Sequence, residues 1–284
     1  MQDTIKSLGE IAKSGEFVSG VPSGFYKLDE VTNGFQKGDL IILAARPAMG
    51  KTALALNCAA HAASPAGGSK KVLVFSLEMP RAQLGQRLLC MEAGINLSAL
   101  RSAQLIEANY PDLVRAASTL YESKLFIDDT GNLSVMDVRT KARRLKAEAG
   151  LDMIVIDYIQ LMRAHRNVQS REQEISQISR GLKILAKELE IPVIAVAQLN
   201  RMVEQRADKR PMPSDLRESG ALEQDSDLII FVYRDGYYNE ESERPDVAEI
   251  IIGKHRNGRT GKIELRFEAQ YTRFQNLETE HPDF

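Results

Sequence analysis

Residues 39–52 read Asp39-Leu-Ile-Ile-Leu-Ala-Ala-Arg-Pro-Ala-Met-Gly-Lys51-Thr52, and this stretch decides the fold. The run 40–43 holds four large apolar side chains in a row, which is typical of a strand buried on both faces. Gly-Lys-Thr follows at 50–52, and the next four residues, Ala-Leu-Ala-Leu, favour a helix. A strand, a tight loop ending in Gly-Lys-Thr and a helix together predict a site for phosphate groups.

The loop of this motif supplies the predicted phosphate contacts, because its N–H groups and the positive helix end face a bound anion. Lys51 is expected to reach the β- and γ-phosphates of a nucleotide, and the hydroxyl of Thr52 to bind Mg²⁺. The predicted nucleotide-contacting residues are Arg46, Pro47, Ala48, Met49, Gly50, Lys51, Thr52 and Ala53. Ala45 stands where the general pattern has glycine, so a chance Gly-Lys-Thr at a helix start is the alternative.

The composition is that of a globular protein. The chain has 284 residues, 43% hydrophobic and 27% charged, which suits one large α/β domain with small additions. Its formal net charge of −2 excludes a global basic field, so a nucleic-acid site would need positive charge gathered locally. Cys58 and Cys90 lack metal-site spacing, and we expect buried thiols. No apolar run approaches ~18 residues, so we expect a soluble, cytoplasmic protein without a membrane segment.

Strand and helix patterns alternate after the phosphate loop. Strands are expected over 72–77, 125–127, 153–156, 193–197 and 228–232, and helices over 26–31, 81–93, 104–123, 135–149 and 171–189. Such alternation predicts an α/β fold with a mostly parallel sheet flanked by helices on both sides. Residues 249–254 and 262–267 flank a turn, and they predict a C-terminal antiparallel hairpin that closes the sheet.

Segments outside this core have weaker patterns. Residues 3–14 have a short amphipathic helix pattern, whose apolar stripe suits its own domain or a partner equally well. The polar stretch 200–214 contains two prolines and is expected to be a mobile loop. We therefore divide the chain into a helical segment over 1–16, a domain over 17–276 and a disordered tail over 277–284.

Two predicted strands end in carboxylates. Asp157 follows the apolar run 153–156, and an aspartate at this place in phosphate-loop NTPases supports the Mg²⁺ shell. Glu78 follows the run 72–77 at a strand end that faces the ligand crevice, where it can deprotonate the water attacking a γ-phosphate. Taken singly, Asp157 is more often a cap or turn residue, and Glu78 can support the cap of the next helix. The presence of Lys51 and Thr52 in the same chain favours the metal role for Asp157 and the catalytic role for Glu78.

Further polar residues lie at the ends of later strands. Gln198 closes the strand 193–197, where an amide can sense a γ-phosphate; a buried, satisfied amide is the alternative. Lys254 and Arg256 lie where the last hairpin begins its turn. Cations beside a transferring phosphoryl group accelerate hydrolysis by ~10³–10⁵, although position alone favours a surface cation pair.

Residues 215–227 precede the strand 228–232 and are the candidate for nucleic-acid contact. They offer Arg217, Ser219 and Gly220 in a polar loop that can touch a nucleic-acid backbone through N–H groups and one cation. An ordinary solvated turn is the alternative. The basic residues within 141–144 fall in a predicted helix, where a solvated face is the default.

Six motifs, taken in order, resemble those of DnaB-type replicative helicases. They are Ala45-Arg-Pro-Ala-Met-Gly-Lys-Thr52, Phe75-Ser-Leu-Glu-Met79, Ile156-Asp-Tyr-Ile-Gln-Leu-Met162, Ala197-Gln-Leu-Asn-Arg201, Asp215-Leu-Arg-Glu-Ser-Gly220 and Lys254-His-Arg-Asn-Gly258. The resemblance spans roughly residues 17–275, and it explains Ala45 because this family commonly lacks the first glycine. The chain resembles the C-terminal RecA-like motor domain of a bacterial replicative DNA helicase.

The resemblance implies a homohexameric ring that encircles single-stranded DNA and moves 5′ to 3′ by hydrolysing ATP with Mg²⁺ at its subunit interfaces. By match, the site residues are Lys51 and Thr52 for phosphate and Mg²⁺, Asp157 for the metal, Glu78 for the water, and Gln198 as γ-phosphate sensor. Lys254 and Arg256 resemble a pair inserted from the neighbouring subunit. Arg217, Glu218 and Gly220, with Ser219 between them, match the channel loop that holds the DNA backbone.

The same resemblance bears on the ends of the chain. Helix 3–14 resembles a linker that docks on the adjacent protomer, and the family's N-terminal collar domain, which recruits primase, is missing. We therefore expect a fragment of a longer protein that meets primase and a helicase loader. Two other interpretations share this core: a RecA-like filament or clock-type ATPase, and a nucleotide-binding assembly module that hydrolyses poorly. Strand-displacement assays would separate the first, and unchanged turnover after Glu78→Gln would support the second.

Overall fold

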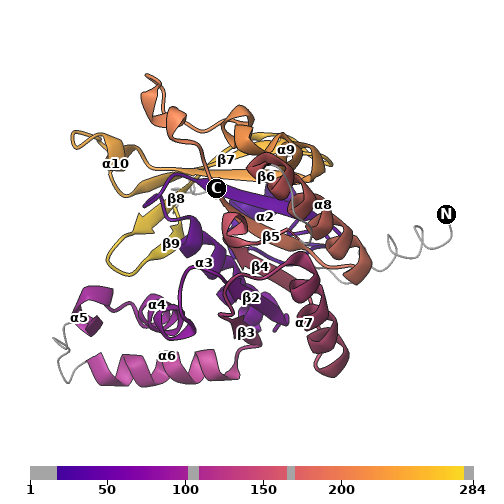
Figure 1. Cartoon of the computed structure of the whole chain (residues 1–284). Coiled ribbons are helices and arrows are strands. Elements are labelled where there is room, and N and C mark those ends of the chain that lie inside the picture. Colours follow the sequence, from indigo (N-terminus) through magenta and orange to yellow (C-terminus); the bar gives the residue numbers. More distant parts are fainter. Residues whose placement is uncertain (1–17, 102–108, 165–169, 278–284) are drawn as a thin grey trace.

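The computed structural model describes residues 18–101, 109–164 and 170–277. These residues form one large sheet with helices packed against it (Figure 1). Within these residues the sheet has nine strands in the order β3-β2-β4-β5-β1-β6-β7-β8-β9. They are β1 (Leu40–Ala45), β2 (Val72–Ser76), β3 (Leu125–Asp128), β4 (Met153–Asp157), β5 (Val193–Gln198), β6 (Leu228–Tyr233), β7 (Val247–His255), β8 (Gly261–Glu268) and β9 (Arg273–Asn276). The first six strands in the sheet order are parallel, and β7, β8 and β9 are antiparallel additions at one side.

Both faces of the sheet carry an apolar core. Every residue of β1, β2, β4 and β6 is buried, which explains why these strands are continuous apolar runs rather than alternating ones. Successive residues of β1 point to opposite faces. Ile41 and Leu43 therefore join one core, whereas Leu40 and Ile42 join the other.

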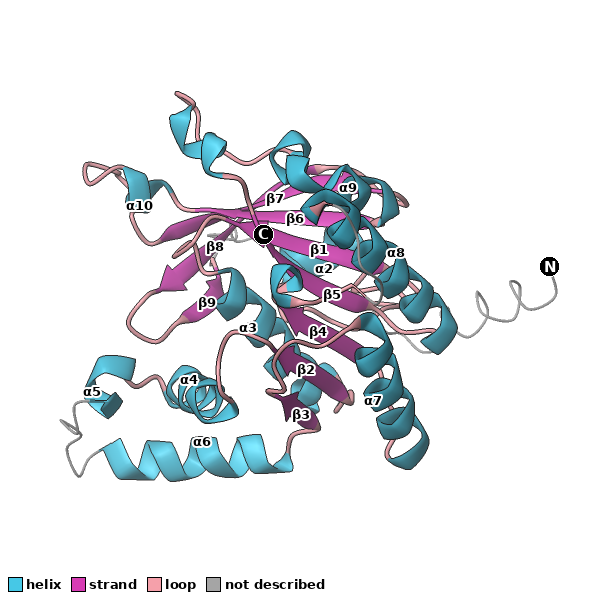
Figure 2. Ribbon diagram, viewed as in Figure 1, coloured by secondary structure: helices cyan, strands magenta, loops and turns pink. Residues whose placement is uncertain are grey.

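Helices cover the two faces (Figure 2). One core receives residues from α2 (Tyr26–Thr32), α3 (Lys51–Ala63) and α4 (Arg81–Ala93), and the other from α7 (Val135–Glu148), α8 (Arg171–Leu189) and α9 (Gly220–Asp225). Next to α4 lie α5 (Leu97–Arg101) and α6 (Tyr110–Glu122), and α10 (Asp235–Tyr238) follows β6. The arrangement is a three-layer α/β sandwich, in which the sheet is the middle layer.

Side-chain caps explain where the two long helices on the second face begin. Ser134 Oγ accepts the Asp137 N–H, and Asp137 Oδ2 accepts the Ser134 N–H at 2.8 Å, which forms a capping box at the start of α7. Ser170 Oγ accepts the Gln173 N–H at 3.2 Å at the start of α8. Each such cap contributes about 1 kcal/mol to helix stability.

Most expected elements are confirmed, with ends shifted by a residue or two. The helices over 81–93 and 171–189 are α4 and α8, and the C-terminal hairpin is β7 paired with β8. Of the helix expected over 104–123, the described part is α6, and residues 102–108 lie outside the described residues. The helix expected over 3–14 also lies outside them, as do residues 278–284 of the tail expected over 277–284.

Two expectations about polar segments are wrong. The stretch 200–214 is not a loop throughout, because it contains the 3-10 helix η4 (Arg201–Gln205), the fully buried Val203 and a set of ion pairs. Residues 215–227 are not a polar loop either, since the 3-10 helix η5 (Pro213–Ser219) and α9 occupy most of them. The short elements α5 and β9 were not expected. None of the described helices is long and apolar enough to cross a membrane.

Candidate nucleotide site

The phosphate loop between β1 and α3 has a backbone that needs glycine. Gly50 has φ +100°, and a Cβ there would lie 3.0 Å from the ring of Phe274 and 3.3 Å from that of Phe267. Ala48 also has a positive φ, of +65°. The first turn of α3 begins at Lys51 and has no side-chain cap, so its N–H groups remain available to an anion.

Parallel strand ends bring most of the predicted residues together. In the sheet register Ala45 pairs with Gln198 and Ser76 with Asp157, so β1, β2, β4 and β5 end at one edge. A cavity of about 280 Å³ opens at this edge, and its lining includes Lys51, Thr52, Glu78 and Gln198. Ligands of open α/β sheets bind in this position, outside the carboxyl ends of the strands.

Lys51 lies between two carboxylates. Its Nζ is 3.9 Å from Asp157 Oδ1 and 4.0 Å from Glu78 Oε2, and it lies 4.7 Å from the centre of the Tyr158 ring. Both carboxylate distances exceed hydrogen-bond length. The ammonium is therefore held by charge in the cavity and keeps its N–H donors for a phosphate.

Asp157 and Thr52 are the candidate metal ligands. Thr52 Oγ1 donates to Asp157 Oδ2 at 2.8 Å, whereas Oδ1 of this buried carboxylate has no hydrogen-bond partner among the residues that the structure describes. Burial raises the pKa of Asp157, and the Lys51 ammonium and the Thr52 hydroxyl oppose that shift. No group of three or more His, Cys, Asp or Glu within the described residues could hold a metal alone. The pair fits Mg²⁺, which commonly binds one or two protein oxygens together with substrate phosphates.

Glu78 faces the same cavity from the end of β2. Its side chain is 53% exposed and pairs with Lys51. The alternative role as a cap of α4 is wrong, because the N-cap is Pro80 and the Arg81 N–H goes to Asp129 Oδ2 at 2.9 Å. The carboxylate is thus left to act in the cavity.

Gln198 is held in place through its backbone. The Gln160 side chain donates from Nε2 to the Gln198 carbonyl at 3.1 Å and accepts the Gln198 N–H at 3.2 Å. The side chain of Gln198 is not fully buried and lines the cavity. Sequence reasoning missed Gln160, although it stands only three residues after Asp157 in the same motif.

Two of the eight predicted nucleotide contacts turn away from the cavity. The Arg46 side chain is buried, and it donates from Nη1 to the Leu199 carbonyl at 2.8 Å and from Nε to Glu204 at 3.0 Å. The Met49 side chain is buried in the apolar core. The side chains of Arg46 and Met49 are therefore not available to a nucleotide in the cavity.

Sequence reasoning also missed Arg234, which follows β6. Its Nη1 donates to the Ala48 carbonyl at 3.3 Å, and its guanidinium lies 4.2 Å from the centre of the Phe267 ring. Burial lowers the pKa of Arg234. Its position after a strand end, the same signal that identified Glu78 and Gln198, could have found it.

Lys254 and Arg256 lie at the opposite edge of the sheet. Lys254 Nζ donates to the carbonyls of Glu223 at 2.5 Å and Ser226 at 2.6 Å. Arg256 lies beside Asp227, whose N–H bonds the Leu40 carbonyl at the start of β1. The six residues of β1 separate the two edges, a distance of about 20 Å at 3.3 Å per residue. The structure therefore does not bring this pair to the phosphate loop of its own chain.

The segment that contains the candidate DNA-binding residues is linked by a backbone hydrogen bond to the chain that leaves the end of β5. The Asn200 N–H, two residues after Gln198, bonds the Asp215 carbonyl at 3.4 Å. Residues 217–219 belong to η5, and the side chains of Arg217, Glu218 and Ser219 lie outside what the structure describes. Gly220 is exposed at the start of α9.

A phosphate loop after the first strand, with carboxylates at the carboxyl ends of β2 and β4, defines a phosphate-loop nucleotide-binding fold of RecA-like type. The chain belongs to the family of DnaB-like helicase C-terminal domains, whose model matches residues 20–276.

Curated relatives and solved structures agree with this family. A replicative DNA helicase DnaB of Geobacillus stearothermophilus is 52% identical over 267 residues, covering 94% of this chain and 58% of that protein. The DnaB of Haemophilus influenzae is 48% identical over 282 residues, covering 98% of this chain and 60% of that protein. A solved ATPase domain superposes with a TM-score of 0.92 at 41% identity over 98% of both chains. A second solved structure is described as a DnaB-like replicative helicase and its interactions with primase. It superposes with a TM-score of 0.90 at 41% identity, covering 98% of this chain and 67% of that chain. The chain thus spans about three fifths of the length of these curated relatives.

Proposed function

We propose that this chain is the ATP-hydrolysing motor of a hexameric DNA helicase, which translocates 5′ to 3′ on single-stranded DNA and unwinds duplex at the replication fork in the cytoplasm. The observation that carries the proposal is the convergence of Lys51, Thr52 and Glu78 on one cavity of about 280 Å³, with Asp157 hydrogen-bonded to Thr52 and 3.9 Å from Lys51. Family membership and the names of the relatives support it.

The residues at this site have separate roles in the transfer of a phosphoryl group to water. Lys51 and the loop N–H groups bind the β- and γ-phosphates of ATP. Thr52 and Asp157 hold Mg²⁺, which when bound neutralises charge on the phosphates. Glu78 accepts the proton of the attacking water, and Gln198 contacts the γ-phosphate.

Lys254 and Arg256 complete the site of a neighbouring subunit. Their place at the opposite edge of the sheet supports this, because a pair that cannot reach its own phosphate loop can reach that of an adjacent copy. A cation at the γ-phosphate in trans stabilises the charge of the transition state. Each working site then needs two chains, as a homohexameric ring provides.

The DNA contacts come from residues 217–220. The Arg217 cation and the N–H groups around Ser219 and Gly220 hold the phosphates of single-stranded DNA in the channel of the ring, with Glu218 in the same segment. This supplies the local positive charge that a chain of net charge −2 lacks overall. In the longer protein we propose a helicase loader and primase as partners; the primase proposal draws on a relative solved with regard to that interaction.

The ATPase rate measured against protein concentration, with and without a single-stranded oligonucleotide, tests this proposal. We expect the rate per chain to rise with concentration, because sites are shared, and to rise again with DNA. A flat rate indifferent to DNA would contradict a composite helicase site. The filament and clock-type interpretations lose their support with the family assignment, and strand displacement from a forked duplex checks this directly.

A further inference from the structure

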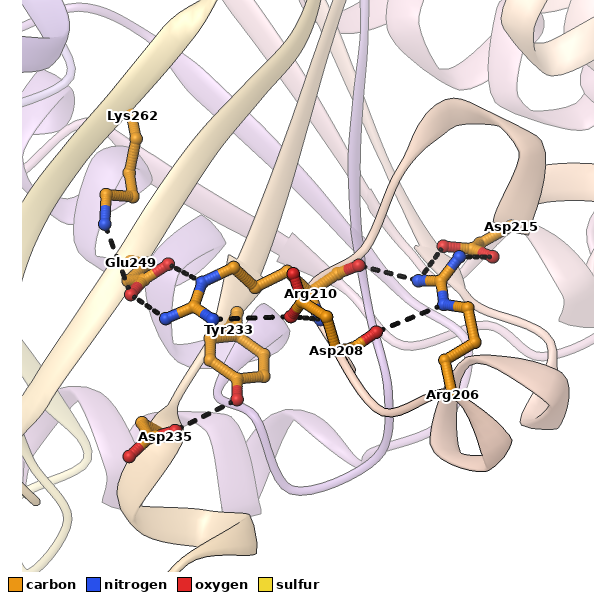
Figure 3. A network of polar contacts seen from close by, with 8 residues as sticks. All are labelled: Arg206, Asp208, Arg210, Asp215, Tyr233, Asp235, Glu249 and Lys262. Carbon is orange, nitrogen blue, oxygen red and sulfur yellow. Dashed lines mark hydrogen bonds and ion pairs between the residues drawn. The ribbon is translucent and has the colours of Figure 1, made fainter. Parts of the chain in front are cut away.

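Residues 199–215, here named the strap, join the nucleotide edge to the candidate DNA segment. The strap starts directly after Gln198 and ends at Asp215 inside η5. It is largely polar, yet Val203 is fully buried and charged side chains pair along its length. Figure 3 shows the part of this network from Arg206 onward.

The first end of the strap is tied to the phosphate loop. The buried Arg46, which directly precedes Pro47 of the loop, donates to the Leu199 carbonyl at 2.8 Å and to Glu204 at 3.0 Å. The Leu199 N–H bonds the Ala45 carbonyl at 3.1 Å. The hydrogen bond from Arg46 lowers the pKa of Glu204, which favours its carboxylate form. Hydrogen bonds therefore link the residues before the phosphate loop to the start of the strap.

The far end of the strap is tied to η5 by one guanidinium. Arg206 donates to both carboxylate oxygens of Asp215, at 3.0 and 2.9 Å, and to the Arg210 carbonyl at 2.6 Å (Figure 3). Asp215 Oδ2 also accepts the Met212 N–H at 2.8 Å, at the start of η5. A two-pronged guanidinium–carboxylate pair fixes direction as well as distance. Arg206, which directly follows η4, thus connects η4 to η5, which contains residues 217–219.

A second two-pronged pair holds the strap to the sheet instead. Arg210 donates to both oxygens of Glu249 in β7, each at 2.8 Å, and Lys262 of β8 lies 3.3 Å from the same carboxylate (Figure 3). The Arg210 guanidinium also lies 4.9 Å from the centre of the Tyr233 ring. Burial alone would raise the pKa of Glu249, but the two cations outweigh it and lower the pKa. This pair anchors the strap without leading to η5.

We propose that Arg206 is a positioning residue that couples the nucleotide site to the DNA-binding segment, through the path Arg46–Glu204, η4 and Arg206–Asp215. The inference rests on the proposed function, because it assumes that the cavity binds nucleotide and that residues 217–220 bind DNA. Arg210 has no place on this path. The two arginines therefore form a matched pair: each makes a two-pronged ion pair from the same strap, and only one leads to η5.

The experiment compares the full chain with its Arg206→Ala and Arg210→Ala variants. Nucleotide affinity is titrated with a fluorescent ATP analogue. Amide hydrogen exchange over 213–225 is then measured with and without a non-hydrolysable ATP analogue and Mg²⁺. We expect nucleotide to change this exchange in the unaltered chain and in Arg210→Ala. In Arg206→Ala we expect unchanged affinity and no exchange response. Arg206→Lys keeps the positive charge but loses the planar guanidinium that binds both carboxylate oxygens. We expect its hydrogen exchange over 213–225 to change only weakly when nucleotide is added.

A second readout is the stimulation of ATP hydrolysis by single-stranded oligonucleotide. Couplings between two sites in proteins are typically ~5- to 150-fold, so we expect Arg206→Ala to lose about fivefold or more of the stimulation while its basal rate stays. Equal losses in the two alanine variants, or none in Arg206→Ala, would overturn the coupling path. A chain that binds no nucleotide at all would instead overturn the proposed function, and binding without any exchange response over 213–225 would overturn the inference alone.

Discussion

Arg256 donates from Nη1 to Oδ1 of Asp227 at 3.0 Å, so the candidate trans-acting cation is held by the residue that precedes β6. The other oxygen of Asp227 accepts the Leu40 N–H at 2.9 Å and the Lys183 ammonium. Asp227 itself is buried. The exposed guanidinium of Arg256 is therefore oriented by a buried, hydrogen-bonded carboxylate, and a group acting across an interface benefits from such preorganisation.

If Arg256 acts on a neighbouring site, mixing two inactive variants should restore activity. Arg256→Ala chains keep their phosphate loops and Lys51→Ala chains keep their cations, so hybrid interfaces contain complete sites. We expect ATPase activity in mixtures to exceed that of either variant alone, with a maximum at an intermediate ratio. No recovery at any ratio would count against a shared site.

Glu78→Gln should separate binding from hydrolysis. General-base catalysis typically contributes ~10²–10⁴ in rate, so we expect turnover to fall by about that factor while ATP binding persists. Single-turnover hydrolysis and a nucleotide titration measure the two quantities. The matched control is Asp129→Asn, which neutralises a carboxylate at the start of α4 outside the cavity and keeps an oxygen for the Arg81 N–H. Unchanged turnover in Glu78→Gln would favour an assembly module over a motor.

Asp39 should make stability depend on pH. Burial, and then the neighbouring Asp227 carboxylate, raise the pKa of Asp39 from 3.8 to about 6. Between these values the folded protein holds a proton that the unfolded chain has released, so stability falls as the pH rises through the window. We expect Asp39→Asn to match the unaltered chain below about pH 4 and to exceed it above pH 6, by about 1–3 kcal/mol because one pKa unit corresponds to about 1.4 kcal/mol. Urea unfolding across this pH range measures the difference in unfolding free energy between the two chains. A difference that does not depend on pH would contradict the prediction.

Arg217→Ala should weaken DNA binding without regard to sequence. One lost phosphate contact lowers the slope of log affinity against log salt by about 0.7 for a single strand. Affinities for two unrelated oligonucleotides at several salt concentrations give both quantities. An unchanged slope would remove Arg217 from the DNA channel.

Residues at the ends of parallel strands could be predicted because the fold gathers those ends at one edge. Lys51, Glu78, Asp157 and Gln198 each follow a recognisable apolar run. The sheet places Lys51, Glu78 and Gln198 around one cavity and Asp157 beside Lys51. The strand β9 gave no such signal, because only Phe274 of its four residues is buried. Its contribution to the site, a ring packed against Gly50, depends on a hairpin register that local sequence does not encode.

The strap was misjudged for a different reason. Its many charged residues are typical of a solvated loop, and the partners that neutralise them lie far away in sequence. Arg46 meets Glu204 across 158 positions, and Arg210 meets Glu249 across 39. Such pairs leave no periodic pattern, so polarity alone cannot distinguish a mobile loop from a cross-braced one.

The antiparallel course of β7 gives each copy of the chain a polarity. The strand returns from the nucleotide edge to the opposite edge, so one end of the molecule carries the phosphate loop and the other carries Lys254 and Arg256. If this pair acts in trans, copies must associate head to tail, because a two-fold dimer would place like ends together. An open row of n copies then has n − 1 complete sites, and closing the row adds the last one. Opening the ring at a single interface would therefore silence one site and leave the others intact.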